Sequence, residues 1–176
     1  MPVDVVRYEA PGWGVGELWF EGERLLYHEL PRAATSPTAA SRGHASRGQV
    51  LHSRSDVAMQ DLTPRLVQRV QDYFRGERVR FDDVEVDLGW ATRFQRSVAE
   101  ELRRVPYGEV VTYGELAALA GYPNAQRAAG TFCAGNRFPL IVPCHRVVAA
   151  SGLGSYGSLG PEYKRRLLAL EGIPLP

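Results

Sequence analysis

The residues best suited to covalent chemistry stand together in one short apolar run. Cys144, His145 and Arg146 interrupt residues 141–148, a stretch that reads as a buried strand or the end of one. The thiolate, not the thiol, is the nucleophile, so a reactive cysteine needs a base or a positive charge beside it. His145 or Arg146 could supply either. The run therefore predicts nucleophilic attack by the sulfur of Cys144, with the thiol proton passed to a neighbouring side chain.

A buried structural cysteine is the alternative for the same residues. Cysteine is among the most buried residue types, so its presence in an apolar run needs no chemistry. Neighbouring side chains on a strand also point to opposite faces, which would separate Cys144 from His145. An irregular turn would remove that objection, and Pro143 favours a turn. Residue types alone leave both interpretations open.

A longer match makes the chemistry specific. Residues 143–147, Pro-Cys-His-Arg-Val, are similar to the active-site signature of the O6-alkylguanine-DNA alkyltransferases, and the resemblance runs from about Phe94 to Gly172. Proteins of that family move an alkyl group from damaged guanine to their own cysteine. The resemblance implies DNA repair by irreversible, stoichiometric transfer from O6-alkylguanine, and from O4-alkylthymine, to Cys144. It implies a methyltransferase that acts once, without a cofactor, as a monomer.

The resemblance also assigns roles to matching residues. Cys144 would be the nucleophile, and His145 would take its proton through a water. Glu171 would stabilise the resulting imidazolium. Tyr113 would help to protonate the leaving guanine, and Asn136 would tie the DNA-binding helix to the turn that holds the cysteine.

Two further sets of residues follow from the same match. Duplex DNA would be bound through its minor groove, with Arg127 taking the place of the extruded nucleotide. The DNA-binding set is Thr112, Arg127, Ala128, Gly130 and Thr131. The set around the alkyl group is Pro139, Val147, Tyr156, Gly157 and Ser158, with the Gly157 amide directed at the guanine oxygen.

This chain departs from the family pattern at three positions. Arg137 follows the hinge asparagine, where relatives often have proline, so the stiffness of the hinge depends on other contacts. Thr131 stands where some relatives have glycine. Ala99 replaces a common tryptophan, so the core around it must be repacked.

Local signals predict the helices that position these residues. Thr92 with Gln95, and Thr112 with Glu115, are capping boxes that open helices. Asn124 is expected to cap a further helix over residues 125–135, and the closely spaced pair reads as a helix-turn-helix. Pro161 opens the last helix, which places Glu171 at a C-terminus that disfavours negative charge.

The first half reads as a scaffold. Residues 3–8, 14–20 and 24–29 predict an antiparallel meander, with Gly22 in a hairpin turn. Thr63 and Pro64 are expected to begin a helix that Gly76 ends. The fold class is therefore α/β (α+β). The predicted domains are a strand-plus-helix scaffold, 1–88, with a mobile loop at 31–56, and a mainly helical domain, 89–176, that carries the helix-turn-helix and the cysteine.

Composition limits the class of protein. Residues 1–90 hold 11 arginines and 14 acidic residues, whereas residues 91–176 hold 10 basic and 6 acidic residues, so the positive half is the one expected to meet phosphate. Two cysteines and four scattered histidines predict no metal site. Without a long apolar segment or a signal-peptide pattern, we expect no membrane partner and a cytoplasmic protein.

Two other functions remain as alternatives. A helix-turn-helix regulator with a buried structural cysteine would bind DNA sequence-specifically and would tolerate Cys144→Ser. A cysteine hydrolase using Cys144 and His145 would turn over acyl substrates repeatedly.

Overall fold

The structure, a computed structural model, describes residues 2–33 and 59–174. Apart from residues 31–33, the predicted mobile loop at 31–56 lies outside the described residues. Contacts divide the chain into two compact units, Met1–Arg80 and Phe81–Pro176. Each unit is described by itself.

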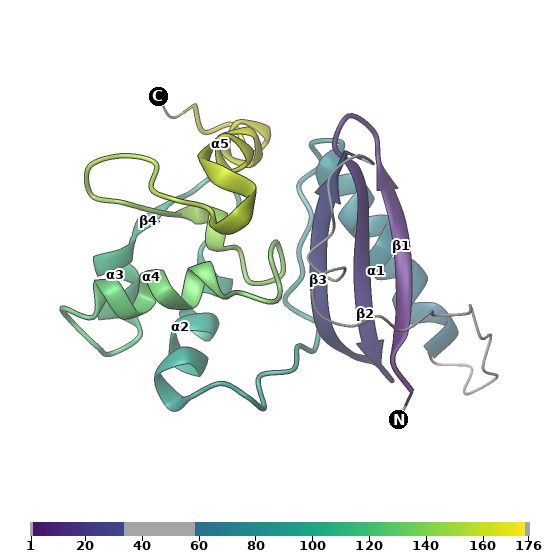
Figure 1. The fold of residues 1–176 in the computed structure, drawn as a ribbon, viewed down its shortest axis with the longest axis horizontal. Coiled ribbons are helices and arrows are strands. Elements are labelled where there is room, and N and C mark those ends of the chain that lie inside the picture. The colour runs from purple at the N-terminus through teal and green to yellow at the C-terminus, as the bar shows by residue number, and fades with distance from the viewer. Residues whose placement is uncertain (1, 34–58, 175–176) are drawn as a thin grey trace. The chain divides into compact units, whose positions relative to one another are not determined.

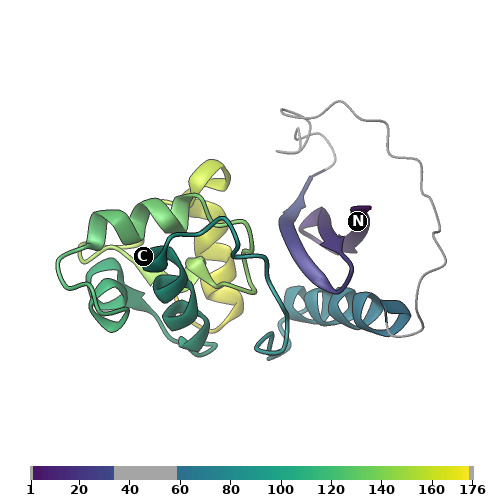
Figure 2. The ribbon, with the colours of Figure 1, turned by 90° about the horizontal axis from the view of Figure 1, so that it is seen from below.

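The first unit contains the predicted meander. Strands β1 (Asp4–Ala10), β2 (Gly14–Glu21) and β3 (Arg24–Arg32) form an antiparallel sheet in the order β1-β2-β3 (Figure 1). Gly22 has a φ of +60°, as a tight turn between β2 and β3 requires. Helix α1 (Met59–Phe74) lies along one face of the sheet (Figure 2). The core between them is formed by buried side chains of both layers: Tyr8, Leu18, Phe20, Leu25, Leu66, Val70 and Tyr73.

The predicted start of α1 was wrong. The helix begins at Met59, so Thr63 and Pro64 lie inside it instead of forming its cap and first position. A proline inside a helix removes the hydrogen bond that its own nitrogen would donate and crowds the carbonyl four residues earlier, but α1 continues through Pro64. The predicted end was right, because α1 stops at Phe74 and Gly76 has a φ of +90°.

The second unit is mainly helical. In chain order its elements are α2 (Arg93–Arg104), β4 (Val111–Thr112), α3 (Tyr113–Leu119), α4 (Gln126–Ala134), the 3-10 turn η2 (Cys144–Arg146), β5 (Val147–Val148), the 3-10 turn η3 (Gly157–Leu159) and α5 (Gly160–Leu170). Strands β4 and β5 pair in parallel, which joins the start of α3 to the segment after Cys144. Helices α3 and α4 pack together across a short turn, which we interpret as a helix-turn-helix.

Both predicted capping boxes are present, but the third cap is different. Thr92 and Thr112 each accept a hydrogen bond from the backbone amide three residues on, at 3.2 Å. Asn124 does not cap α4, because Ala125 is the residue at its N-terminus and makes no side-chain cap. Asn124 instead has a φ of +67°, a conformation that asparagine tolerates better than most residues.

The unit boundary lies before the predicted one at residues 88 and 89. One guanidinium nitrogen of Arg103 on α2 donates to the carbonyls of Phe81, Asp82 and Val84, at 2.9, 3.1 and 2.9 Å. Phe81 and Val84 are also buried. These contacts attach Phe81, Asp82 and Val84 to the second unit, so we call residues 81–92, which lead into α2, the entry segment.

Candidate active site

Cys144 lies in a 3-10 turn, not in a strand. Its amide donates to the carbonyl of Val142 at 2.8 Å, and the amide of Arg146 donates to that of Pro143 at 2.9 Å. Because the turn does not alternate faces as a strand does, both Cys144 and His145 are buried, with 5% and 0% of their surface exposed. Burial of the pair is therefore compatible with shared chemistry.

The side chain of Asn136 joins the end of α4 to the thiol. Its Nδ2 donates to the carbonyl of Val142 at 2.7 Å and to Cys144 Sγ at 3.1 Å, and its Oδ1 accepts from the amide of Phe138 at 3.0 Å. The thiol also reaches the hydroxyl of Tyr156, at 4.0 Å. Burial raises the pKa of Cys144, and the hydrogen bonds to Asn136 and Tyr156 lower it again in part.

Glu171 is the centre of a buried polar network. Its Oε1 lies 2.6 Å from His145 Nε2, and its Oε2 accepts from the amide of Gly108 at 3.0 Å. Arg146 donates to the same carboxylate through Nε, at 3.0 and 3.2 Å, and through a terminal nitrogen at 3.0 Å. Burial alone would raise the pKa of Glu171, but the hydrogen bonds and charges of His145 and Arg146 outweigh it and hold the pKa well below its usual value.

This network sets the protonation of His145. An ionised carboxylate only accepts hydrogen bonds, so Nε2 carries the proton and Nδ1 is the basic nitrogen of the neutral ring. Burial lowers the pKa of His145 more than the neighbouring carboxylate raises it. We therefore assign to His145 a neutral ring in the tautomer with its proton on Nε2, held by Glu171.

Arg146 does not supply the positive field that its sequence position suggested for Cys144. Its guanidinium is bound to Glu171 and, through its other terminal nitrogen, to the carbonyl of Val105 at 2.8 Å. The ammonium of Lys164 on α5, which is buried, is a positive charge that lowers the pKa of the thiol. Its Nζ donates to the carbonyl of Val147 and, at 3.3 Å, to that of Ser155.

Sequence reasoning missed Lys164, although the pattern contained a signal. Positions 164, 167, 168 and 171 follow the spacing of a single helix face, and all four residues on it are buried. A lysine on the buried face of a helix needs partners inside the protein. Lys164 finds them in two carbonyls and in the ring of Tyr113, whose centroid is 5.7 Å from Nζ. Burial lowers its pKa.

Tyr113 is enclosed by α4 and by the loop that follows β5. A Cβ at Gly130 would lie 3.8 Å from its ring, and one at Gly154 would lie 3.4 Å from the ring and from its hydroxyl. Burial, with smaller contributions from Cys133 and Cys144, raises the pKa of Tyr113 to about 12. Its hydroxyl therefore keeps its proton across the neutral range.

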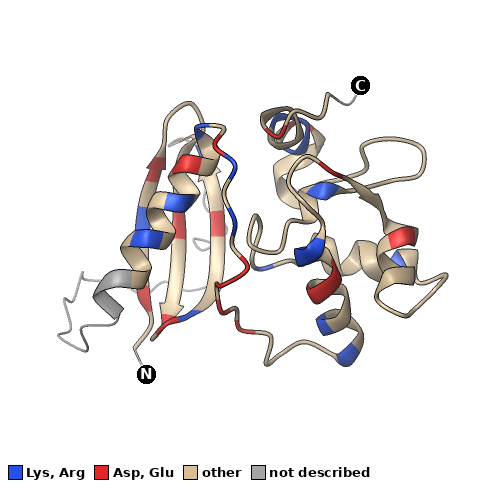
Figure 3. Cartoon of the chain, turned by 180° about the vertical axis from the view of Figure 1, so that it is seen from behind, with Lys and Arg blue, Asp and Glu red and all other residues tan. Residues whose placement is uncertain are grey.

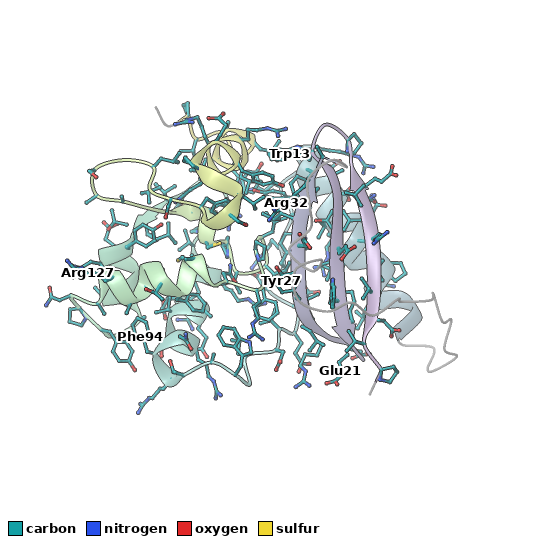
Figure 4. The ribbon with its side chains drawn as sticks, in the orientation of Figure 1. Trp13, Glu21, Tyr27, Arg32, Phe94 and Arg127 are labelled. Atoms are coloured by element: carbon teal, nitrogen blue, oxygen red, sulfur yellow. The ribbon has the colours of Figure 1, made fainter. Side chains whose placement is uncertain are left out.

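Helix α4 presents a nearly uncharged surface. Arg127 is its one charged residue, and Figure 4 shows that side chain pointing away from the body of the unit. Ala128 and Thr131 are exposed beside it, and the Thr131 hydroxyl donates to the carbonyl of Arg127 at 3.0 Å. Helix α2, by contrast, carries both acidic and basic residues (Figure 3). The hydroxyl of Thr112 is used as the cap of α3.

The residues predicted around the alkyl group differ in burial. Val147 and Tyr156 are buried, Pro139 is half-buried, and Gly157 and Ser158 are exposed. Tyr156 is the member of this set that reaches the thiol. Gly157, with a φ of +48°, begins η3 in a conformation that favours glycine.

One buried residue near the thiol has an unusual backbone. Leu140 has a φ of +71°, which non-glycine residues rarely adopt, and only 2% of its surface is exposed. It lies between the Asn136 turn and the carbonyl of Val142 that Asn136 binds. Its side chain thus anchors the turn in the core.

Within residues 2–33 and 59–174, no group of three or more histidine, cysteine, aspartate or glutamate side chains could hold a metal ion. In the same part of the chain, every helix is too short or too polar to cross a membrane.

Comparisons with known proteins match most of the second unit. The family described as 6-O-methylguanine DNA methyltransferase, DNA binding domain, matches residues 93–173. A methylated-DNA–protein-cysteine methyltransferase of Methanopyrus kandleri is 50% identical over 107 residues, which are 61% of this chain and 79% of that protein.

Solved structures match over nearly the whole chain. The O6-methylguanine methyltransferase of Mycobacterium tuberculosis is 35% identical, with a TM-score of 0.74 over 97% of this chain and 93% of that one. The same organism's OGT in complex with DNA is 36% identical, with a TM-score of 0.71 over 97% and 94%. The mixed helix-and-strand fold is thus confirmed. By these similarities, the chain belongs to the methylated-DNA–protein-cysteine methyltransferases, the family of O6-alkylguanine-DNA alkyltransferases.

Proposed function

We propose that this protein repairs DNA by moving an alkyl group from O6 of guanine, and from O4 of alkylthymine, to Sγ of Cys144. The observation that carries this assignment is the buried thiol hydrogen-bonded to Asn136, next to a histidine held by Glu171. A structural cysteine would need neither partner. Each protein molecule reacts only once, because the thioether formed at Cys144 has no easy route back to a thiol.

The transfer is a displacement at carbon. The Cys144 proton passes through a bridging water to Nδ1 of His145, and Glu171 stabilises the imidazolium that forms. The sulfur then bonds to the alkyl carbon while the bond between that carbon and O6 breaks. The electron pair moves into the guanine, whose ring nitrogen receives a proton from Tyr113 as the charge develops. The proton held by His145 then returns through water to the Tyr113 oxygen, so the net change moves the thiol proton to the guanine. No cofactor is needed for this balance.

DNA is bound through α4 in the minor groove. The alkyl carbon inside a base stack cannot reach a buried thiol, so the nucleotide must be extruded, at a cost of a few kcal/mol. Arg127 fills the gap that it leaves, and the small side chains of Ala128 and Gly130 allow close approach to the backbone. Thr112 and Thr131 complete the DNA contacts. The guanine then lies against Pro139, Val147, Tyr156, Gly157 and Ser158. The reaction takes place in the cytoplasm, and one protein molecule repairs one lesion.

Mass spectrometry of the intact protein tests the reaction. After incubation with duplex DNA that contains O6-methylguanine, we expect a single added methyl group on Cys144 and a plateau at one group per molecule. Cys144→Ser should accept none while still binding DNA. Repeated turnover would contradict the mechanism, and a regulator with a structural cysteine would show no added mass at all.

Arg127→Ala should separate extrusion from chemistry. We expect it to slow repair of duplex DNA at least ~10-fold, because part of the cost of extrusion is no longer offset. Reaction with free O6-benzylguanine should be nearly unchanged. The single-turnover rate on each substrate measures this, with the exposed Arg104→Ala on α2 as the control for loss of one positive charge. Equal losses on both substrates would show that Arg127 acts on folding or on the thiol.

A further inference from the structure

The hinge that holds Asn136 has a partner outside the site. Arg137 follows Asn136 directly, and its guanidinium carbon lies 4.4 Å from the centroid of the Trp90 ring. This is well within the distance at which a guanidinium is attracted to an aromatic face. The contact joins the hinge to the segment that leads into α2.

Trp90 is a fixed platform. Its Nε1 donates to the carbonyl of Asp87 at 2.8 Å. The amides on either side of it are also used, that of Gly89 by the Asp87 carboxylate at 3.1 Å and that of Ala91 by the carbonyl of Leu88 at 3.0 Å. The turn that carries the ring is therefore bound on both sides.

Arg137 lies at the centre of a small side-chain turn. Oδ1 of Asn136 accepts from the amide of Phe138, two residues on, so this hydrogen bond spans Arg137. The opposite end of the same amide group, Nδ2, donates to Cys144 Sγ. Fixing the side chain of Arg137 therefore restricts the rotation of the group that binds the thiol. Proline, which relatives often have at this position, would stiffen the hinge through its backbone. Here the side chain of Arg137 stiffens it.

We propose that Arg137 and Trp90 form a brace that keeps the Asn136 amide aligned with Cys144. Arg137 is a positioning residue, because it acts through Asn136 and does not touch the reacting atoms. The proposal rests on the alkyl transfer proposed above. It adds a determinant of thiol reactivity that lies in the entry segment, far along the chain from the hinge.

The test uses single-turnover transfer at saturating duplex DNA, measured against pH. Without the brace the Asn136 hydrogen bond is made less often, so the pKa of the thiol rises and the profile moves to higher pH. For Arg137→Gln, which keeps a long polar side chain without the charge, we expect a loss of about two- to fivefold near neutral pH. The loss should shrink at high pH, where the thiol is ionised in both proteins.

Three further variants decide the case. Trp90→Leu should give the same shift, and the double variant should lose no more than either single one, because the two side chains act as one unit. Arg137→Lys, which keeps a cation over the ring, should recover part of the rate. Arg93→Ala, an exposed arginine at the start of α2, is the matched control and should leave the profile unshifted.

Other outcomes would overturn the brace. Additive losses would show that Arg137 and Trp90 act separately. Slower transfer with an unshifted pH profile would show that they do not act through the thiol. A weaker Kd for the duplex with an unchanged rate at saturation would make Arg137 a DNA contact instead. If the unaltered protein transfers no methyl group, the proposed function itself fails, and the brace fails with it.

Discussion

Replacing Glu171 by glutamine is expected to slow alkyl transfer by about 10²-fold, the lower range for general acid-base assistance. It should also lower the free energy of unfolding by about 3–5 kcal/mol, the usual result of removing one partner from a buried ion pair. Both effects have the same origin. The carboxylate balances the charge of Arg146, which is 8% exposed. It also accepts a hydrogen bond from the N–H group at Nε2 of His145, which leaves Nδ1 as the basic nitrogen of the ring.

The measurement is the single-turnover rate against pH for four proteins: the unaltered chain, Glu171→Gln, His145→Ala and the double variant. The double variant should lose little more than either single one, because Glu171 acts through His145. Glu162→Gln, which removes an exposed carboxylate from the same helix, is the control and should change neither rate nor stability. Fully additive losses would mean that Glu171 only holds its helix and Arg146.

The depressed pKa of Glu171 gives the pH dependence of stability a definite sign. Its folded pKa lies below its unfolded value, so the unfolded chain binds the proton more readily. The stabilisation it provides is fully present above about pH 4.3, the ordinary pKa of a glutamate. It is lost as the pH falls below that value toward the folded pKa. In Glu171→Gln this acid-dependent part of the unfolding curve should be missing.

Lys164→Met should be the second damaging change, for a different reason. Methionine is unbranched like lysine and one atom shorter, so most of the packing is preserved, but the carbonyl of the buried Val147 loses its donor, at about 1–3 kcal/mol for a buried unsatisfied group. The carbonyl of the exposed Ser155 loses the same donor. The thiol loses its nearby positive charge. The pKa of the thiol should therefore rise further, which leaves less thiolate near neutral pH and slows transfer.

Measuring both the free energy of unfolding and the transfer rate separates the role of Lys164 as a hydrogen-bond donor from its role as a charge. Lys164→Gln retains a donor without the charge, so it should recover stability more than it recovers the rate. Arg166→Met, an exposed change on the same helix, is the control. If Lys164→Met left the pH profile of transfer unshifted, the lysine would serve only to hold the loop that contains Ser155.

Local signals explain which parts of the fold could be predicted. The capping boxes at Thr92 and Thr112 depend on residues three apart, so the sequence contains all of their geometry. Asn124 misled because asparagine is both a good cap and a residue that tolerates positive φ. Pro64 gave a wrong start for α1 because proline favours the first position of a helix, whereas this helix accommodates it farther in. In both cases one residue type fits two conformations, and only the packing of neighbouring elements selects between them.

Contacts between distant segments explain what could not be predicted at the site. The resemblance to the alkyltransferases pointed to Cys144, His145 and Glu171, but the partner of Arg146 and the burial of Lys164 depend on how α5 packs against the thiol turn. The stacking of Arg137 on Trp90 joins two segments that no local pattern relates. The buried face of α5 was the one readable clue, because that face and the residue that caps it include two ionisable residues, Lys164 and Glu171.

The left-handed backbone of Leu140 affects how the turn that holds the thiol can move. Left-handed conformations cost an ordinary residue about 1–2 kcal/mol, so this residue would relax if its surroundings allowed it. Leu140→Gly would relieve the backbone strain but would leave a cavity where the side chain packs. The first change raises the free energy of unfolding and the second lowers it. The turn can therefore relax only by drawing Leu140 out of the core. Its amides should exchange with solvent as slowly as those of the central helices, in the manner of a rigid part instead of a surface loop.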